Sequence, residues 1–188
     1  MATRADSSNI LMRNNGWWNA DTTDPEVVYL ASGERQLNLR QKRAAVIGCG
    51  GAGRAIAAAL MRSGAEVTLI NRGAKRGRYA ASLLGLPYVP LSEFSAEGFD
   101  VVVNATPVGR DEQIAPFNLE TLSDEVLIID LVYGSSPTPL VETSLAREQV
   151  VIDGRDVLWT QVSRQFRMMT GNEMPKTGAT IKSRRAAS

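Results

Sequence analysis

The sequence of 188 residues contains no histidine and a single cysteine, Cys49. Histidine is the side chain most often used for acid–base chemistry near neutral pH, and it is the commonest metal ligand. Its absence leaves carboxylates, lysine or a bound cofactor to carry any chemistry, and we expect no metal site. The lone cysteine excludes an internal disulfide, and its place within a glycine turn indicates a small buried residue rather than a reactive thiol.

The sequence also lacks an excess of charge and any long hydrophobic run. The 21 lysines and arginines balance 20 acidic residues, and the net charge of +1 gives no reason to expect a nucleic acid or a membrane as partner. No apolar run approaches the roughly 20 residues that cross a bilayer, and the polar start does not resemble a signal peptide. With 44% hydrophobic residues the chain can bury a sizeable core. We therefore expect a cytoplasmic protein of one large domain, with or without appendages.

The most informative stretch covers residues 44–55. A short apolar strand is followed by the pattern Gly48-x-Gly50-x-x-Gly53 and by an alanine-rich helix that continues to about Ser63. In this context the pattern is typical of dinucleotide binding. Gly48 permits a tight turn, Gly50 permits the approach of a pyrophosphate, and Gly53 permits close packing of the helix on the strand. The N–H groups at the helix start would then face the phosphates. The alternative is an ordinary strand-to-helix turn that uses glycine only for its positive φ.

Strand and helix patterns alternate along the rest of the chain. The sequence predicts six strands, at 44–47, 67–70, 87–89, 99–104, 125–130 and 150–152, and helices from the glycine turn to 63, over 75–84 and over 138–148. A last helix opens at Gly154, places Leu158, Val162, Phe166 and Met169 on one face, and ends at Gly171. This alternation predicts a Rossmann-like, doubly wound α/β fold, with a mainly parallel six-stranded sheet and helices on both faces.

The residues before the glycine turn follow another pattern. Short runs at 10–13 and 17–19 on either side of Asn15-Gly16 predict a β-hairpin. Asp24 and Pro25 are typical of a helix start, with Asp24 as N-cap and Pro25 as the first helical residue. Val27, Val28 and Leu30 would form the buried face of that helix, and residues 32–42 would form a polar connector.

The end of the second sheet strand indicates which nucleotide binds. NAD-binding units usually carry Asp or Glu here to bind the ribose 2′-hydroxyl, whereas this chain has Asn71, followed by Arg72, Lys75, Arg76 and Arg78. Guanidinium groups bind a 2′-phosphate through charge-assisted hydrogen bonds, and a carboxylate would repel it. The pattern therefore favours NADP over NAD. A solvated basic face on an ordinary helix is the alternative.

Residues 104–109, Asn-Ala-Thr-Pro-Val-Gly, leave the fourth strand at the same edge of the predicted sheet. Ligands of such sheets bind outside the carboxyl ends of the strands. One interpretation is therefore contact between this loop and the nicotinamide end of a cofactor. The other is a loop stiffened by proline, and spacing alone does not separate the two.

Several stretches together resemble the shikimate dehydrogenase family. Residues 46–55 resemble its phosphate loop, and residues 71–76 resemble its NADP-selecting Asn-Arg-Thr-x-x-Arg, with Gly73 in place of threonine. Residues 104–109 match its Asn-Ala-Thr-Pro-x-Gly loop. The likeness covers about residues 9–171.

Two further segments carry the resemblance toward the end of the chain. Residues 130–140 match the family's Asp-x-Val-Tyr…Thr-Pro-Leu, with Ser135 in place of proline. Residues 154–161 match its Gly-x-x-Met-Leu-x-x-Gln, with Val157 in place of methionine. On the cofactor side, the resemblance implies NADP contacts from Gly48, Gly50, Gly51, Ala52, Gly53, Asn71, Arg72, Arg76, Asn104, Ala105, Thr106, Val132 and Gly154.

On the substrate side, the start of the chain resembles two short family motifs. Residues 9–11 resemble Asn-Thr-Leu/Val, and residues 20–24 resemble Gly-x-Asn-Thr-Asp, with departures at Ala20 and Thr22. The resemblance implies reversible hydride transfer between NADPH and the 3-keto group of 3-dehydroshikimate, which gives shikimate. It assigns Asp24 to the family's catalytic Lys–Asp pair, and it implies substrate contacts from Asn9, Asp24, Tyr133 and Gln161. Without it, Asn9 reads as a turn residue, Tyr133 as a strand-end aromatic and Gln161 as a polar helix residue.

The resemblance also predicts how the chain is organised. The family's lysine belongs to a substrate domain that would precede Asn9, so we expect this chain to be the cofactor-binding portion, with that domain as a partner and a homodimer as one possible assembly. We divide the chain into a substrate-domain remnant with the hairpin and Asp24 (1–24), an NADP-binding domain (25–153), a C-terminal helix (154–173) and a disordered tail (174–188). Two alternatives stay open: a stand-alone, non-catalytic NADP-binding module, and a quinate/shikimate dehydrogenase of a bifunctional polypeptide.

Overall fold

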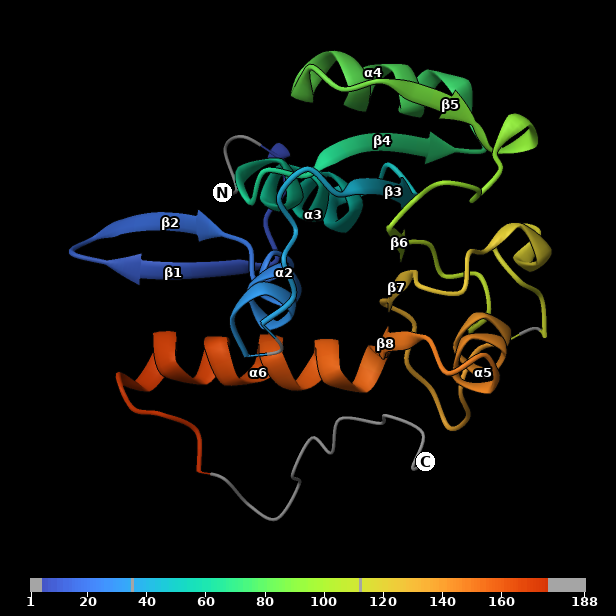
Figure 1. The fold of residues 1–188 in the computed structure, drawn as a ribbon. Helices are drawn as coiled ribbons and strands as arrows, with labels where there is room; N and C mark the ends of the chain where they lie inside the picture. Colours follow the sequence, from blue (N-terminus) through green and yellow to red (C-terminus); the bar gives the residue numbers. More distant parts are fainter. Residues whose placement is uncertain (1–4, 35, 112, 176–188) are drawn as a thin grey trace.

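Six parallel strands form the centre of the molecule in this computed structural model, which describes residues 5–34, 36–111 and 113–175 (Figure 1). The strands lie in the order β5-β4-β3-β6-β7-β8. Their bounds are Arg43–Ile47 (β3), Glu66–Asn71 (β4), Tyr88–Pro90 (β5), Val101–Asn104 (β6), Leu127–Asp130 (β7) and Val150–Ile152 (β8). The helices are α2 (Glu26–Tyr29), α3 (Gly51–Arg62), α4 (Ala74–Leu84), α5 (Pro139–Ala146) and α6 (Gly154–Thr170). Each predicted strand and helix of the sheet region is present, and its ends differ by no more than about two residues from those expected.

Strand β3 shows why both faces of the sheet are covered. Ala44 and Val46 belong to one buried cluster, and Ala45 and Ile47 belong to another, as expected where successive side chains point to opposite faces. Residues of α2, α3, α4 and α6 contribute to the first cluster. The second cluster contains residues of α5 and is flanked by the short 3₁₀ turns η2 (Leu91–Glu93) and η3 (Leu119–Thr121). The prediction of a doubly wound Rossmann-like sheet is confirmed.

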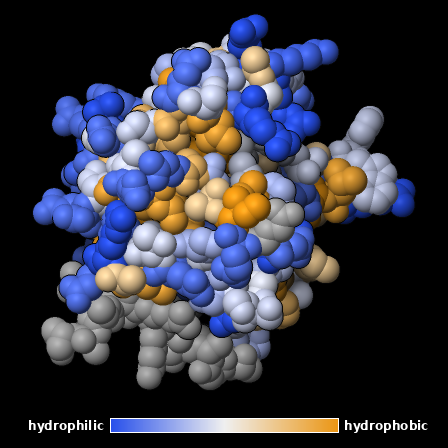
Figure 2. Space-filling model, turned by 90° about the vertical axis from the view of Figure 1, so that its right-hand side faces the viewer, coloured by the Kyte–Doolittle hydropathy of each residue, from blue (hydrophilic) through white to orange (hydrophobic). Residues whose placement is uncertain are grey.

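The surface on the side of η2, η3 and α5 is not uniformly polar. Figure 2 shows this side of the molecule, with apolar side chains gathered near the centre and hydrophilic ones around them. Phe94 and Phe117, which flank the second cluster, are only partly buried and make an edge-on ring contact with centroids 5.3 Å apart.

The strand order brings three chain segments to one edge of the sheet. β3 pairs with β4 on one side and with β6 on the other, and Ile47 is in register with both Ile70 and Asn104. The chain therefore switches direction beside β3, and a crevice opens at the carboxyl ends of the strands in sheets of this kind. The residues that follow β3, β4 and β6 meet at this edge.

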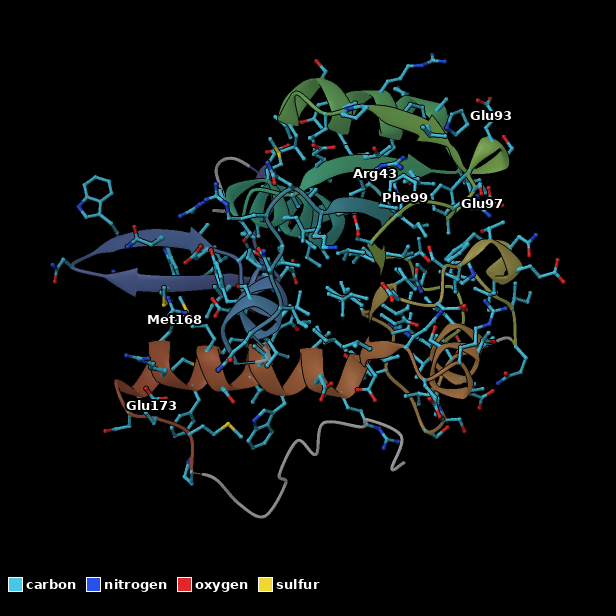
Figure 3. All side chains as sticks on the ribbon, viewed as in Figure 1. Arg43, Glu93, Glu97, Phe99, Met168 and Glu173 are labelled. Atoms are coloured by element: carbon cyan, nitrogen blue, oxygen red, sulfur yellow. The ribbon has the colours of Figure 1, made fainter. Side chains whose placement is uncertain are left out.

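The hairpin predicted near the start of the chain is confirmed. β1 (Ile10–Asn14) and β2 (Trp17–Asp21) pair antiparallel, and Asn15 and Gly16 have φ values of +48° and +86°. The hairpin projects away from the sheet above α6 (Figure 1), and Met168 of α6 lies between the two (Figure 3). Trp17 and Trp18 remain 78% and 69% exposed.

The apolar stripe of α6 is present but remains largely on the surface. Leu158 and Val162 are each 38% exposed and Met169 is 77% exposed, whereas Gly154 and Val157 are buried. The helix ends at Gly171, as predicted, with a φ of +72°. The helix packs against α2, and this contact leaves much of its apolar stripe uncovered.

Two expectations for the segment after the hairpin are wrong. Helix α2 begins at Glu26 with Pro25 as its N-cap and without any side-chain cap, so Asp24 is not the capping residue. Asp24 instead accepts hydrogen bonds from other elements. Residues 32–42 are not a purely polar connector either, because a π-helical turn covers Leu30–Glu34 and Leu39 is buried in the core.

Two further predictions concern the end of the chain and the absence of a membrane span. Residues 176–188, most of the expected tail, lie outside the described residues. Within the described residues, no helix combines the length and the apolar character needed to cross a membrane.

Candidate functional site

The glycine turn after β3 gives each of its three glycines a different environment. Gly48 has a φ of +102°, and a Cβ atom there would lie 2.9 Å from the Ala105 carbonyl oxygen. A Cβ atom at Gly53 would overlap the Gly48 carbonyl oxygen, whereas one at Gly50 would meet nothing within 4 Å. The tight turn and the close helix packing predicted from the sequence are confirmed, and the space above Gly50 is open.

A cavity of about 1000 Å³ lies at the carboxyl edge of the sheet. The glycine turn, the start of α4 and the loop after β6 contribute to its wall. Seven of the predicted cofactor residues line it: Gly48, Gly50, Asn71, Arg72, Arg76, Ala105 and Thr106. Lys75 and Tyr79 line it as well. The structure therefore brings the glycine turn and the basic segment (residues 72–76, with Arg72, Lys75 and Arg76) into one cavity.

Asn71 connects the parts of this cavity. Its Oδ1 accepts a hydrogen bond from the Cys49 backbone N–H at 3.1 Å, and its Nδ2 donates to the Gly73 carbonyl oxygen at 2.8 Å. The side chain thus ties the glycine turn to the start of α4. Cys49 itself is fully buried, and burial raises the pKa of its thiol to about 11, in agreement with an unreactive role.

Residues 5–7 lie across the start of α3, an arrangement that no pattern in the sequence predicts. Arg54 donates hydrogen bonds to the carbonyl oxygens of Ala5 at 2.8 Å and Asp6 at 2.6 Å. The Tyr79 hydroxyl donates to the Asp6 carboxylate at 2.8 Å, and a Cβ atom at Gly51 would overlap Ser7 Oγ. The start of the described chain is therefore anchored beside the glycine turn by contacts that span 48 to 73 residues.

A second, smaller cavity of about 130 Å³ lies beyond β7. Val132, Tyr133 and Gly154, three of the predicted site residues, line it together. They are held close because a Cβ atom at Gly154 would overlap the Val132 carbonyl oxygen. Tyr133 is 48% exposed, and the Arg110 guanidinium lies 6.0 Å from its ring centroid.

Asn104 carries a polar side chain that is fully buried at the end of the central strand β6. Its Oδ1 accepts from the Thr106 hydroxyl at 2.7 Å, and its Nδ2 donates to Asp130 at 3.0 Å. Asp130 is also fully buried, and this burial raises the pKa of its carboxyl. The polar groups at the ends of β6 and β7 are thus bonded to each other beneath the surface of the site.

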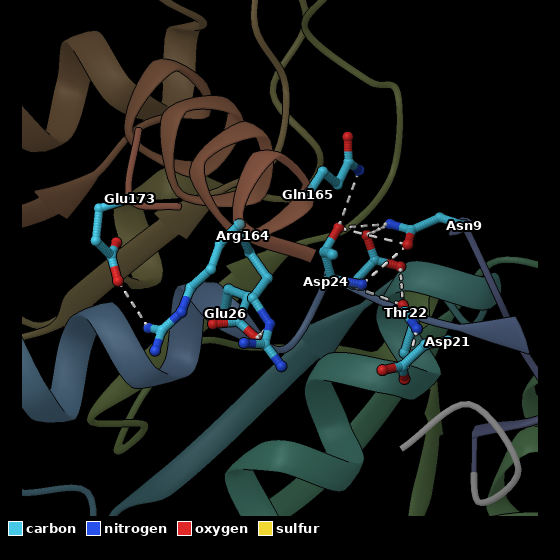
Figure 4. A network of polar contacts seen from close by, with 10 residues as sticks. Asn9, Asp21, Thr22, Asp24, Glu26, Arg164, Gln165 and Glu173 are labelled. Carbon is cyan, nitrogen blue, oxygen red and sulfur yellow. Dashed lines mark hydrogen bonds and ion pairs between the residues drawn. The ribbon is translucent and has the colours of Figure 1, made fainter. Parts of the chain in front are cut away.

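Asp24 is the centre of a polar cluster at the end of the hairpin, part of which Figure 4 shows. Its Oδ1 accepts from Asn9 at 3.1 Å and from Gln161 of α6 at 2.8 Å, and its Oδ2 accepts from Thr22 at 3.1 Å. Asp24 is buried, and burial raises the pKa of its carboxyl even though these three hydrogen bonds act to lower it. Among the described residues, no lysine or arginine forms an ion pair with this carboxylate.

The cluster also joins α2 and α6. Gln165 donates to Thr23 Oγ1 at 3.3 Å, and Arg164 forms an ion pair with Glu26 at 3.6 Å (Figure 4). Asn9, Asp24 and Gln161 are therefore brought together as substrate-side candidates. Tyr133 lies apart from them. It is next to Gly154, the first residue of α6, and Gln161 follows seven residues, or roughly 10 Å, further along that helix.

Comparison with known proteins gives independent findings. The family model described as shikimate / quinate 5-dehydrogenase matches residues 30–134. The shikimate dehydrogenase (NADP(+)) of Xylella fastidiosa (strain 9a5c) is 32% identical over 180 residues, which cover 90% of this chain and 64% of that protein. The chain therefore spans slightly less than two thirds of the length of this relative.

Two solved structures share the fold over most of this chain. The shikimate 5-dehydrogenase of Thermus thermophilus, in complex with NADP(H) and shikimate, is similar with a TM-score of 0.81 at 31% identity, over 93% of this chain and 66% of that one. The ligand-free 5-ketofructose reductase of Gluconobacter sp. strain CHM43 has a TM-score of 0.78 at 25% identity, over the same shares of the two chains. The matching family model, the similar proteins and the glycine turn in the parallel sheet all point to one family. This chain belongs to the shikimate/quinate 5-dehydrogenase family.

Proposed function

We propose that this protein binds NADP(H) in the 1000 Å³ cavity and forms the cofactor-binding portion of a shikimate dehydrogenase. One observation carries the proposal: the glycine turn and the three cations Arg72, Lys75 and Arg76 line the same cavity. The relative from Xylella fastidiosa is named for NADP(+), and the structure from Thermus thermophilus contains NADP(H) and shikimate. Both names support the same cofactor here.

The residues of the cavity fit an anionic dinucleotide in three respects. Its volume is at the upper end of the roughly 300–1,000 Å³ that is usual for small-molecule sites. The open space above Gly50 admits a pyrophosphate, and the first turn of α3 contains no acidic residue and no side-chain cap that would compete for its N–H groups. Arg72, Lys75 and Arg76 are exposed, and none of them forms an ion pair with another described residue. They are available to bind a 2′-phosphate.

We propose that Asp24 assists proton transfer to and from the substrate, while the bound cofactor supplies the hydride. Asp24 is a buried carboxylate whose described partners are all neutral donors, and such a group favours a cationic partner. In this proposal a lysine from a substrate-binding domain pairs with Asp24 and exchanges the proton with the reacting oxygen. Asn9 and Gln161 orient the carboxylate through its Oδ1.

Substrate contacts belong to the same proposal. Asn9 and Gln161 carry amide groups next to Asp24 that can bond to hydroxyl or carboxylate oxygens of shikimate. Tyr133 presents an exposed ring and hydroxyl from the loop after β7. The cluster around Asp24 and the loop of Tyr133 would contact the substrate from two sides.

Titration with NADPH and NADH tests the proposed function. Arg72→Ala and Arg76→Ala each remove a charge-assisted contact of about 1.5 kcal/mol, so NADPH binding should weaken about tenfold while NADH binding should change little. Arg78→Ala is the matched control, because Arg78 lies on α4 together with Arg76 and is exposed but does not line the cavity. Equal losses for both nucleotides, or saturable binding of NADH alone, would reject the assignment.

An activity assay on the same protein tests whether catalysis requires a separate substrate domain. With the substrate domain as a separate requirement, the 188-residue chain should bind NADPH but oxidise shikimate little or not at all. Rapid shikimate oxidation by this chain alone would contradict the proposal that another domain supplies the lysine.

A further inference from the structure

We propose that Asp130 is a positioning residue that holds the two loops forming the nicotinamide half of the cofactor site. These loops are residues 104–109 after β6 and residues 131–137 after β7. The inference rests on the proposed NADP(H) binding and deepens it, because it names the side chain on which the shape of one half of that site depends.

The Asp130 carboxylate accepts hydrogen bonds from three different segments. Its Oδ1 accepts from Asn104 Nδ2 at 3.0 Å and from the backbone N–H of Val132 at 3.0 Å. Its Oδ2 accepts from the Thr138 hydroxyl at 2.6 Å. Thr138 Oγ1 in turn accepts from the Val141 N–H at 3.2 Å and caps α5. One side chain thus joins the end of β6, the loop after β7 and the start of α5.

The contact to Asn104 extends into the loop that lines the large cavity. Asn104 Oδ1 accepts from both the backbone N–H of Thr106 at 3.1 Å and its hydroxyl at 2.7 Å. Thr106 Oγ1 accepts from the Val108 N–H at 3.2 Å. The conformation of residues 104–108 is therefore set from below by side chains that Asp130 orients.

The contact to Val132 acts on the other loop. Val132 and Tyr133 line the small cavity, and Gly154 packs directly against the peptide between them. Asp130 lies between these two groups of wall residues, because it contacts Asn104 on one side and Val132 on the other. A change at Asp130 therefore shifts both walls, whereas its side-chain hydrogen bonds do not extend to the glycine turn or the basic segment.

The chemistry of Asp130 fits positioning better than charge pairing. It is fully buried, and among the described residues no lysine or arginine forms an ion pair with it. A carboxylate accepts from several donors at once, which neither an alanine nor an apolar residue of the same size can do. Its loss leaves the Thr138 hydroxyl and the Val132 N–H without their acceptor, and Asn104 Nδ2 then keeps only its 3.3 Å contact to the Val108 carbonyl oxygen.

Two probes separate the halves of the cofactor site. NADPH contains the nicotinamide, whereas 2′,5′-ADP contains only the adenosine and phosphate groups that the glycine turn and the basic segment would bind. Calorimetry gives Kd for both, and the fluorescence enhancement of the dihydronicotinamide reports how the ring itself is held. The wild-type chain should bind NADPH more tightly than 2′,5′-ADP.

Asp130→Ala should weaken NADPH about tenfold, as expected if the loops adopt the binding conformation only about one tenth of the time. It should leave 2′,5′-ADP within about twofold of the wild type and reduce the fluorescence enhancement. Asp130→Asn keeps an acceptor toward Asn104 and Val132 and should restore most of the NADPH affinity. If Asp130→Ala is too unstable to assay, Thr138→Val removes one of the three bonds while keeping the volume, and it should show the same selective loss in smaller measure.

Asp100→Ala is the matched control. Asp100 also ties strand ends together, accepting from the Arg43 N–H at 2.8 Å and pairing with Lys42 at 2.8 Å, but it does so at the opposite, amino-terminal edge of the sheet. This variant should leave the affinities for both probes unchanged.

Several results would overturn the inference. Parallel losses for NADPH and 2′,5′-ADP in Asp130→Ala would show a merely structural role. Unchanged NADPH affinity in both Asp130→Ala and Thr138→Val would show that Asp130 does not position the loops, and equal wild-type affinities for the two probes would show that the nicotinamide half adds nothing to binding. Failure of the wild type to bind either probe would instead reject the proposed function, and the inference with it.

Discussion

Gly53→Ala tests whether the glycine turn is shaped by packing. Gly53 is buried at the start of α3, and an added Cβ atom would overlap the Gly48 carbonyl oxygen, a backbone atom that cannot rotate away. Such overpacking costs about 1–3 kcal/mol, and the gain from replacing glycine by alanine within a helix is about 0.5–1 kcal/mol. Because the overlapped atom belongs to the backbone, we expect a cost of about 2–2.5 kcal/mol, which leaves a net destabilisation of about 1–2 kcal/mol.

Thermal unfolding measures this effect. For a chain of this size, about 1–2 kcal/mol lowers Tm by roughly 2–8 °C. NADPH affinity should fall as well, because the helix can regain its packing only by moving away from the turn that faces the phosphates.

Gly50→Ala is the control that separates packing from ligand approach. Gly50 has φ −72° and ψ −174°, which alanine adopts freely, and nothing lies within 4 Å of the added Cβ atom. The fold should lose less than about 1 kcal/mol. NADPH binding should nevertheless weaken about tenfold, as for the loss of one charge-assisted hydrogen bond. Gly53→Ala as stable as the wild type, or Gly50→Ala less stable than Gly53→Ala, would refute the reasoning.

Three further outcomes are expected. Burial raises the pKa of Asp24 above its ordinary value of 3.8, so its contribution to stability is largest below that value and is lost as the pH rises through the raised pKa of the folded state. In urea unfolding, the free energy of unfolding of Asp24→Asn should therefore fall less than that of the wild type as the pH rises above about 4. An identical pH dependence for the two proteins would contradict this. Cys49, buried and with its pKa raised to about 11, should react with a thiol reagent at about pH 8 much more slowly in the native protein than in denaturant, whereas fast native labelling would show an open turn. Leu60→Ala should destabilise by about 2–5 kcal/mol in urea because Leu60 is fully buried in the main cluster; Leu83→Ala, at a position that is 38% exposed on α4, should cost much less.

The sheet and its glycine turn could be predicted because their signals are local. Strands buried on both faces, such as β6 with Val101, Val102 and Val103, appear as continuous apolar runs. The spacing of Gly48, Gly50 and Gly53 specifies a turn whose backbone conformation and close contacts depend on a few residues that are near in the chain. The hairpin turn at Asn15 and Gly16 was predictable for the same reason.

Local signals misled where distant groups competed for a side chain. Asp24 before Pro25 has the pattern of an N-cap, yet its carboxylate bonds to Asn9, Thr22 and Gln161 instead. Periodicity placed the apolar residues of α6 on one face but could not indicate how much of this face would remain exposed.

The sequence by itself determined the α/β class, the glycine turn and the basic segment after β4, because each depends on neighbours in the chain. Only the tertiary structure decided that Gln161 reaches Asp24 across 137 residues, that Asp6 lies beside Tyr79, and that Asp130 bonds to three separate segments. Hydrogen bonds of this kind depend on which elements pack together in the folded chain. Such long-range contacts produce no local or periodic pattern in the sequence from which they could be predicted.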